Sequence, residues 1–142
     1  MFLALLTGVA MSTQAAVNSK LSASVESPVL AAFISFATGT IALFVCVLLS
    51  GASFGDLIRA KDAPPISWIG GGLGVFFVLV MINTVPRIGV ALSFSLAIAG
   101  QMIVALIIDH FGLLGVTERS ISWPRVLGAL LVMAGVVIIR LF

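Results

Sequence analysis

Five apolar stretches, each close to 20 residues long, follow one another along the sequence. A transmembrane helix needs about 20 mostly apolar residues, because each residue adds about 1.5 Å across a hydrocarbon core of roughly 30 Å. Only 8% of the 142 residues are charged, against about 25% in a soluble domain, so most of the surface must face lipid. We therefore expect an all-α integral membrane bundle of about five transmembrane helices, forming one domain over residues 1–142. The predicted spans cover residues 2–21, 28–49, 66–84, 89–108 and 124–142.

Local signals predict where several of these helices begin and end. Ser27 followed by Pro28 is typical of a helix start, with a capping hydroxyl and then proline at the first helical position. The third helix is expected to end near Thr84, because Pro86 lacks the N–H group that a helix interior requires. Residues 50–65 form the most polar connection and are expected to lie in water.

The lysine and arginine residues give almost no preferred orientation in the membrane. With the N-terminus inside, four would lie on the cytoplasmic side and three on the opposite side. The positive-inside rule acts on this difference, and a difference of one residue is very small. The chain therefore inserts either with its N-terminus inside or in both orientations. The four are Arg59, Lys61, Arg119 and Arg125, and the three are Lys20, Arg87 and Arg140.

The odd number of predicted helices favours pairing between oppositely oriented copies. Alternating access commonly rests on two inverted repeats with the binding site between them, and five helices barely enclose a polar path. We therefore expect an antiparallel homodimer of ten helices, or the same arrangement with a homologous sister chain. The lipid bilayer and a small-molecule substrate of unknown identity are the other expected partners.

Small residues recur at helical spacing in several predicted spans. Gly70 and Gly74 are one turn apart in the third span, and Gly128 and Gly135 are two turns apart in the last. Helices in lipid associate through close packing of their backbones, which small residues permit. These glycines indicate either contacts within the bundle or a dimer seam, for which the last span is favoured. The second span has the same spacing at Ala31, Ser35 and Gly39.

Four amide side chains lie within the predicted spans. Gln14 and Asn18 share one face of the first helix, Gln101 lies near the middle of the fourth, and Asn83 lies near the end of the third. Polar groups in hydrocarbon are costly and often mark a solute path. The alternative is hydrogen bonding between helices, worth about 0.6 kcal/mol for each contact.

Asp109 and His110 form the strongest constellation of ionisable groups. A carboxylate in the last turn of a helix opposes the helix dipole by roughly 0.3–1 kcal/mol, so Arg119, Arg125 or the neighbouring imidazole should compensate it. The pair could act as a proton site or gate if the helix extends to Phe111. It would be an interfacial anchor if the helix ends earlier. Residues 109–122 are expected to form an interfacial segment broken by Gly112 and Gly115.

Several classes of function find no support in the residues. No serine–histidine–acid pattern, paired catalytic carboxylates or phosphate-binding loop is present, so the protein is not expected to be an enzyme. Cys46 and His110 are the only cysteine and histidine, which argues against a metal site, and no cofactor is expected. The positive charges are spread along the chain, which argues against nucleic-acid binding.

Motifs along nearly the whole chain together resemble a known membrane family. They are Gln14-Ala15-Ala16-Val17-Asn18-Ser19-Lys20-Leu21, Ser27-Pro28, Gly70-Gly71-Gly72-Leu73-Gly74, Pro86-Arg87-Ile88-Gly89, Ala99-Gly100-Gln101, Asp109-His110-Phe111-Gly112-Leu113-Leu114-Gly115, and Arg125 with Gly128 and Gly135. The chain resembles a half-size, five-helix member of the YdcZ-type family in the drug/metabolite transporter superfamily. The resemblance implies five helices, residence in the bacterial inner membrane, and dual-topology, paired or fused forms. Small multidrug resistance relatives use a glutamate in the first helix for proton exchange, whereas Gln14 and Asn18 occupy that region here.

These observations favour a secondary transporter of a small polar solute that works as a dimer. Gln14, Asn18, Gln101 and Asn83 would line its path, and Asp109 with His110 would form a gate or proton site. A passive channel and a membrane scaffold without flux of its own are the alternatives.

Overall fold

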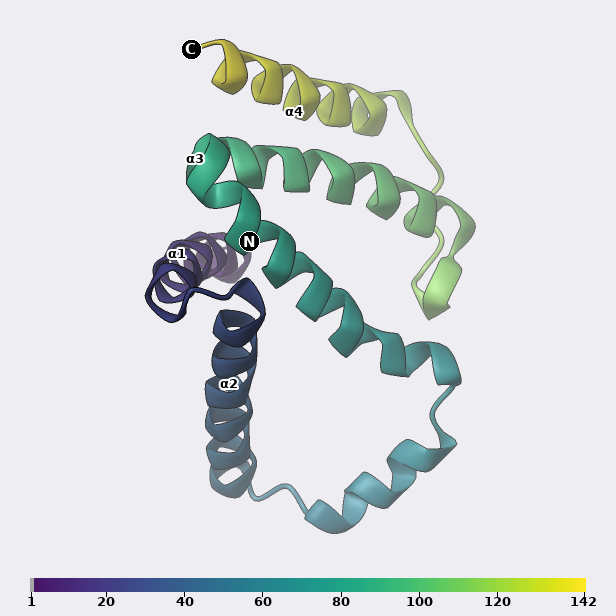
Figure 1. The fold of residues 1–142 in the computed structure, drawn as a ribbon. Helices are drawn as coiled ribbons and strands as arrows, with labels where there is room; N and C mark the ends of the chain where they lie inside the picture. Colours follow the sequence, from purple (N-terminus) through teal and green to yellow (C-terminus); the bar gives the residue numbers. More distant parts are fainter. Residues whose placement is uncertain (1) are drawn as a thin grey trace. The chain divides into compact units, whose positions relative to one another are not determined.

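The computed structural model describes residues 2–142, which form helices and connecting segments without any strand (Figure 1). This confirms the expected all-α class. The elements in chain order are α1 (Phe2–Val25), α2 (Pro28–Ser50), the 3-10 helices η1 (Phe54–Asp62) and η2 (Pro65–Trp68), α3 (Ile69–Phe111), the 3-10 turn η3 (Leu113–Gly115) and α4 (Trp123–Leu141). The chain divides into an N-terminal unit, residues 2–87, and a C-terminal unit, residues 88–142.

The turn between α1 and α2 forms as the sequence predicts. Ser27 is the N-cap of α2, and its hydroxyl oxygen accepts a hydrogen bond of 3.2 Å from the Leu30 N–H group. Pro28 then occupies the first helical position, where no N–H group is needed. Glu26 takes the left-handed conformation that reverses the chain, with φ of 53°.

Small side chains hold the helices of the N-terminal unit together. Ala31 and Ala32 of α2 are almost fully buried and contact Val78 and Ile82 of α3. Because alanine side chains are short, the backbones can approach closely, which is how helices without a hydrophobic driving force pack in lipid. Leu21, Val25, Phe77 and Leu79 extend this cluster.

Helix α3 contains two helical segments, as the sequence predicts, but the break between them lies at Gly89 and not before Pro86. The helical conformation passes through Pro86 and is interrupted only at Gly89, with φ of 81° and ψ of 163°. Proline fixes its own φ at a helical value and removes a single hydrogen bond, so a helix can continue past it. Glycine has no Cβ and adopts the positive φ that breaks the helix. The hydroxyl group of Ser93 donates a hydrogen bond of 2.7 Å to the Gly89 carbonyl oxygen.

Three helical segments are long and apolar enough to cross a membrane among the described residues: Pro28–Ser50, Pro65–Phe111 and Trp123–Leu141. The second has 47 residues, about twice the length that one span requires. Helix α1 has 24 residues but is more polar and is not among the three. Many large apolar side chains are exposed, among them Trp123 at 86%. Such a surface needs lipid or a partner to cover it.

Candidate functional site

Asn18 is the most buried polar side chain of the N-terminal unit, with 4% of its surface exposed. It lies one helical turn after Gln14 on α1, and both side chains line a small hollow against α3. The side chain of Asn18 makes no hydrogen bond to another described residue. The remaining lining residues are Met11 and Ala15 of α1, with Phe77, Val78 and Met81 of α3.

The hollow beside Asn18 is too small for a solute. Its volume is about 10 Å³, which is close to the smallest space that holds one water molecule. Among the described residues, every fully buried side-chain nitrogen or oxygen atom has a hydrogen-bond partner, so the Asn18 amide keeps some exposed surface. A single water, or one polar atom of a bound molecule, could therefore bond to it from the hollow.

Gln14 also lines a larger groove between α1 and α2, with a volume of about 240 Å³. The α2 side of this groove carries two hydroxyl groups, those of Ser35 and Thr40, beside apolar walls. Sequence analysis missed the hydroxyl groups as site residues. The spacing of Ser35 and Gly39 was a signal for this face, but it was interpreted as helix packing alone. The α2 residues of the groove are Ser35, Phe36, Gly39, Thr40 and Leu43.

The other two predicted path residues line neither the hollow nor the groove. Asn83 donates a hydrogen bond of 2.8 Å to the Leu79 carbonyl oxygen and lines a different, shallow hollow with Phe76 and Thr84. Gln101 lies in the C-terminal unit, exposed on α3, and makes no hydrogen bond to another described residue. The N-terminal unit therefore brings together two of the four predicted amides.

Asp109 and His110 lie in the last turn of α3, which extends to Phe111. The helix ends because Gly112 takes the left-handed conformation, with φ of 58°. The Asp109 carboxylate accepts a hydrogen bond from Arg125 of α4 and forms an ion pair with it. This is the compensation that a carboxylate at a helix C-terminus requires.

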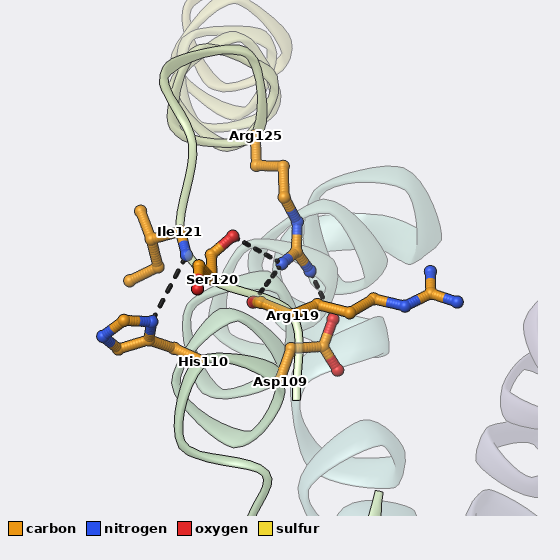
Figure 2. Close-up of polar contacts among 6 residues, drawn as sticks. All are labelled: Asp109, His110, Arg119, Ser120, Ile121 and Arg125. Carbon is orange, nitrogen blue, oxygen red and sulfur yellow. Dashed lines mark hydrogen bonds and ion pairs between the residues drawn. The ribbon is translucent and has the colours of Figure 1, made fainter. Parts of the chain in front are cut away.

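Residues 112–122 fold back onto this last turn of α3 (Figure 2). The Asp109 carbonyl oxygen accepts a hydrogen bond of 2.7 Å from the Arg119 N–H group, and His110 Nδ1 accepts one of 3.3 Å from Ile121 N–H. Arg125 also donates to the Arg119 carbonyl oxygen at 2.8 Å. His110 Nδ1 serves as a hydrogen-bond acceptor in this arrangement.

The ion pair is about two thirds buried, since the Arg125 and Asp109 side chains are 31% and 33% exposed. Figure 2 shows the guanidinium group of Arg119 pointing away from Asp109, so Arg119 contributes only its backbone. The carboxylate is already neutralised and hydrogen-bonded. The cluster therefore acts first as a clamp that holds residues 112–122 in place.

The four glycines predicted as packing positions have different surroundings. A methyl group built at Gly74 would lie 3.6 Å from the Phe36 ring, so Gly74 lies at a contact with α2. A methyl group at Gly70, Gly128 or Gly135 would meet no described heavy atom within 4 Å. Those three positions make no close contact among the described residues.

Comparison with known proteins gives one family. The model described as "Putative inner membrane exporter, YdcZ" matches residues 1–138. The "Inner membrane protein YdcZ" of Escherichia coli (strain K12) is 34% identical over 101 residues, which are 67% of this chain. The match spans 64% of the length of that relative. No solved structure matches the chain.

These matches confirm the resemblance that the sequence motifs indicated. The family points to a transporter and not to an enzyme. The helices that are long and apolar enough to cross a membrane agree with a multi-pass protein of the inner membrane. The chain belongs to the YdcZ family, which is described as a "putative inner membrane exporter".

Proposed function

We propose that the protein is a secondary transporter of a small solute and works as a dimer. The observation that carries the proposal is the Asn18 side chain, which is almost fully buried, has no partner among the described residues and adjoins Gln14. The amide keeps some exposed surface, because no fully buried side-chain nitrogen or oxygen atom among the described residues lacks a partner. A solute or its water can therefore reach it, and amides within a membrane span often mark a solute path.

Gln14 and Asn18 would form the centre of the path. Gln101 would add a further polar group, because an exposed amide on a membrane helix needs a partner from another helix or a solute. Asn83 would contribute less, since its amide already bonds to its own helix.

The clamp at the end of α3 would act as the gate. Asp109 and His110 hold residues 112–122 in place: the Asp109 carbonyl oxygen accepts a hydrogen bond from Arg119 N–H, and His110 Nδ1 accepts one from Ile121 N–H. Protonation of His110 at Nδ1 would replace an acceptor by a donor, and the Ile121 N–H group would lose its partner. Loss of this hydrogen bond would release the C-terminal end of residues 112–122 from α3.

The proposed dimer is antiparallel and contains ten helices. Support comes from the small charge difference between the two sides and from the open surroundings of Gly128 and Gly135 on α4. Single cysteines beside Arg59 and Arg140, Ala60→Cys and Leu141→Cys in a Cys46→Ser background, leave both arginines in place and should each react with an impermeant maleimide from both sides of the membrane. One-sided labelling at both positions would contradict dual topology and leave a sister chain as the inverted partner.

Gly128→Leu should weaken the dimer, because a bulky side chain would occupy a surface reserved for close backbone approach. The measurement is chemical crosslinking of the chain in membranes. Gly100→Leu is the matched control, since Gly100 is also helical and surrounded by open space. Equal crosslinking in both variants would exclude α4 as the seam.

Transport is tested in liposomes that contain the purified chain and an imposed pH gradient. A carrier gives solute flux that saturates with concentration, and Gln14→Leu and Asp109→Asn should each reduce that flux. Full flux in both variants would remove these residues from the path and gate. A large ohmic current would indicate a channel, and copurification of a larger stoichiometric partner without flux would indicate a scaffold.

A further inference from the structure

We propose that the groove between α1 and α2 binds a small uncharged solute with an apolar or aromatic body and an amide-like, hydrogen-bonding head. The inference rests on the proposed transport function, because it names the class of solute for the same path. It is carried by the chemistry of the groove lining, its size and the absence of charge among the residues that form it.

The groove combines hydrogen-bonding groups with apolar walls. The Gln14 amide can both donate and accept. The Thr40 hydroxyl donates to the Phe36 carbonyl oxygen at 2.8 Å, so its oxygen remains able to accept a hydrogen bond from a ligand. Phe36 and Leu43 supply apolar surface against which a ring can pack.

The size of the groove restricts the solute to a small molecule. Its volume of about 240 Å³ lies just below the roughly 300–1,000 Å³ of sites for drug-sized ligands, which suits a single substituted ring. Gln14 forms part of both the groove and the hollow beside Asn18. The hollow holds one water at most, so Asn18 would complete the site through a bridging water.

Charge decides the class of solute. No ionisable side chain lines the groove or the hollow. Lys20 follows Asn18 by two residues, which places it about 200° away around the helix. An ion in this groove would lose hydration without gaining an opposite charge from these walls. The other ionisable side chains among residues 2–87 are Glu26, Cys46, Asp56, Arg59, Lys61, Asp62 and Arg87.

Benzamide, benzamidinium and benzoate test this inference directly, because the three share a ring and differ in charge. Each is titrated against the purified full-length chain in lipid nanodiscs, with ligand-observed NMR as the readout. Benzamide should bind saturably, and both ions should bind at least about tenfold more weakly, as expected where a charge finds no partner. Equal or tighter binding of either ion, or no saturable binding of benzamide, would overturn the inference.

Variants assign the binding to the groove. Gln14→Leu removes the amide, and Gly39→Leu adds a side chain to the groove from a position where a new Cβ meets no other described heavy atom within 4 Å. Both should weaken benzamide binding by about tenfold or more, and Thr40→Val by about threefold, the loss expected for one neutral hydrogen bond. Unchanged affinity in Gln14→Leu and Thr40→Val would overturn the assignment even if Gly39→Leu fails to fold.

Two variants are matched controls. Thr38 has the same side chain as Thr40, and its hydroxyl donates to the Ser35 carbonyl oxygen at 2.9 Å, but it does not line the groove. Gly71 is helical and open like Gly39, and it also lies outside the groove. Thr38→Val and Gly71→Leu should bind benzamide as the unmodified chain does. A loss in the controls equal to that in Thr40→Val and Gly39→Leu would overturn the inference.

The same preparation separates this inference from the proposed function. Selective benzamide binding without flux of any solute in liposomes would support the site and contradict transport. Saturable flux of another solute without benzamide binding would support transport and contradict the site.

Discussion

The two units of the chain differ in whether their key polar side chains have hydrogen-bond partners. In residues 2–87 the amide of Asn18 makes no hydrogen bond to another described residue and lines a small hollow, where it keeps some exposed surface. In residues 88–142 the carboxylate of Asp109 is paired with Arg125, and the imidazole of His110 accepts a backbone hydrogen bond.

This difference separates groups kept for a ligand from groups that hold the chain. An ionic cluster whose groups are all paired stabilises a helix end. Removing one member leaves the remaining charge without a partner, so the free energy of desolvating that charge is no longer offset. A neutral amide that makes no hydrogen bond within the described residues contributes little to stability, so its replacement by an apolar side chain should cost little. The comparison therefore predicts a clear loss of stability for changes in the ionic cluster and little or none for a change at Asn18.

The largest expected loss of stability is for Arg125→Met, which leaves the Asp109 carboxylate unpaired in a position two thirds buried. We expect about 2 kcal/mol, between the values typical of exposed and of buried ion pairs. Thermal unfolding in detergent measures it. Arg119→Met is the matched control, because that guanidinium points away from the cluster, and its effect should stay below about 0.5 kcal/mol. Equal losses of stability in Arg125→Met and Arg119→Met would show that the Asp109–Arg125 ion pair does not hold residues 112–122 in place.

Gly112→Ala should cost about 1–2 kcal/mol, because a non-glycine residue at φ of 58° is strained. The added methyl group would also lie 3.4 Å from the Val116 carbonyl oxygen. The same thermal assay applies, and Gly100→Ala serves as the control. Gly100 is helical with open surroundings, so that change should be neutral or stabilising. No loss for Gly112→Ala would mean that residues 112–122 are not held against α3.

The smallest expected change in stability is for Asn18→Leu. Leucine replaces an amide that makes no hydrogen bond to another described residue and keeps some exposed surface, so stability should change by less than about 0.5 kcal/mol. Benzamide binding and solute flux should fall together. A clear loss of stability would show that Asn18 is a structural group, and the contrast between the two units would then disappear.

The candidate site was predictable from sequence only in part. Gln14 and Asn18 were found because amides are rare in apolar helices and the two lie one turn apart. Asn83 shares that chemistry, yet it bonds to its own helix and lines another hollow. Thr40 and Ser35 gave no signal as site residues, because a single hydroxyl in an apolar helix usually bonds to a carbonyl of the preceding turn.

The sequence by itself determined the helical class, the membrane character of the chain and the start of α2 at Ser27 and Pro28. These features depend on composition and on groups within one helical turn. Only the tertiary structure decided that α3 breaks at Gly89 and not before Pro86, and that Arg125, not Arg119, pairs with Asp109. It also decided that Asn18 is buried against Val78 and Met81. Burial and pairing depend on which distant segments approach one another, and spacing along a single helix carries no information about that approach.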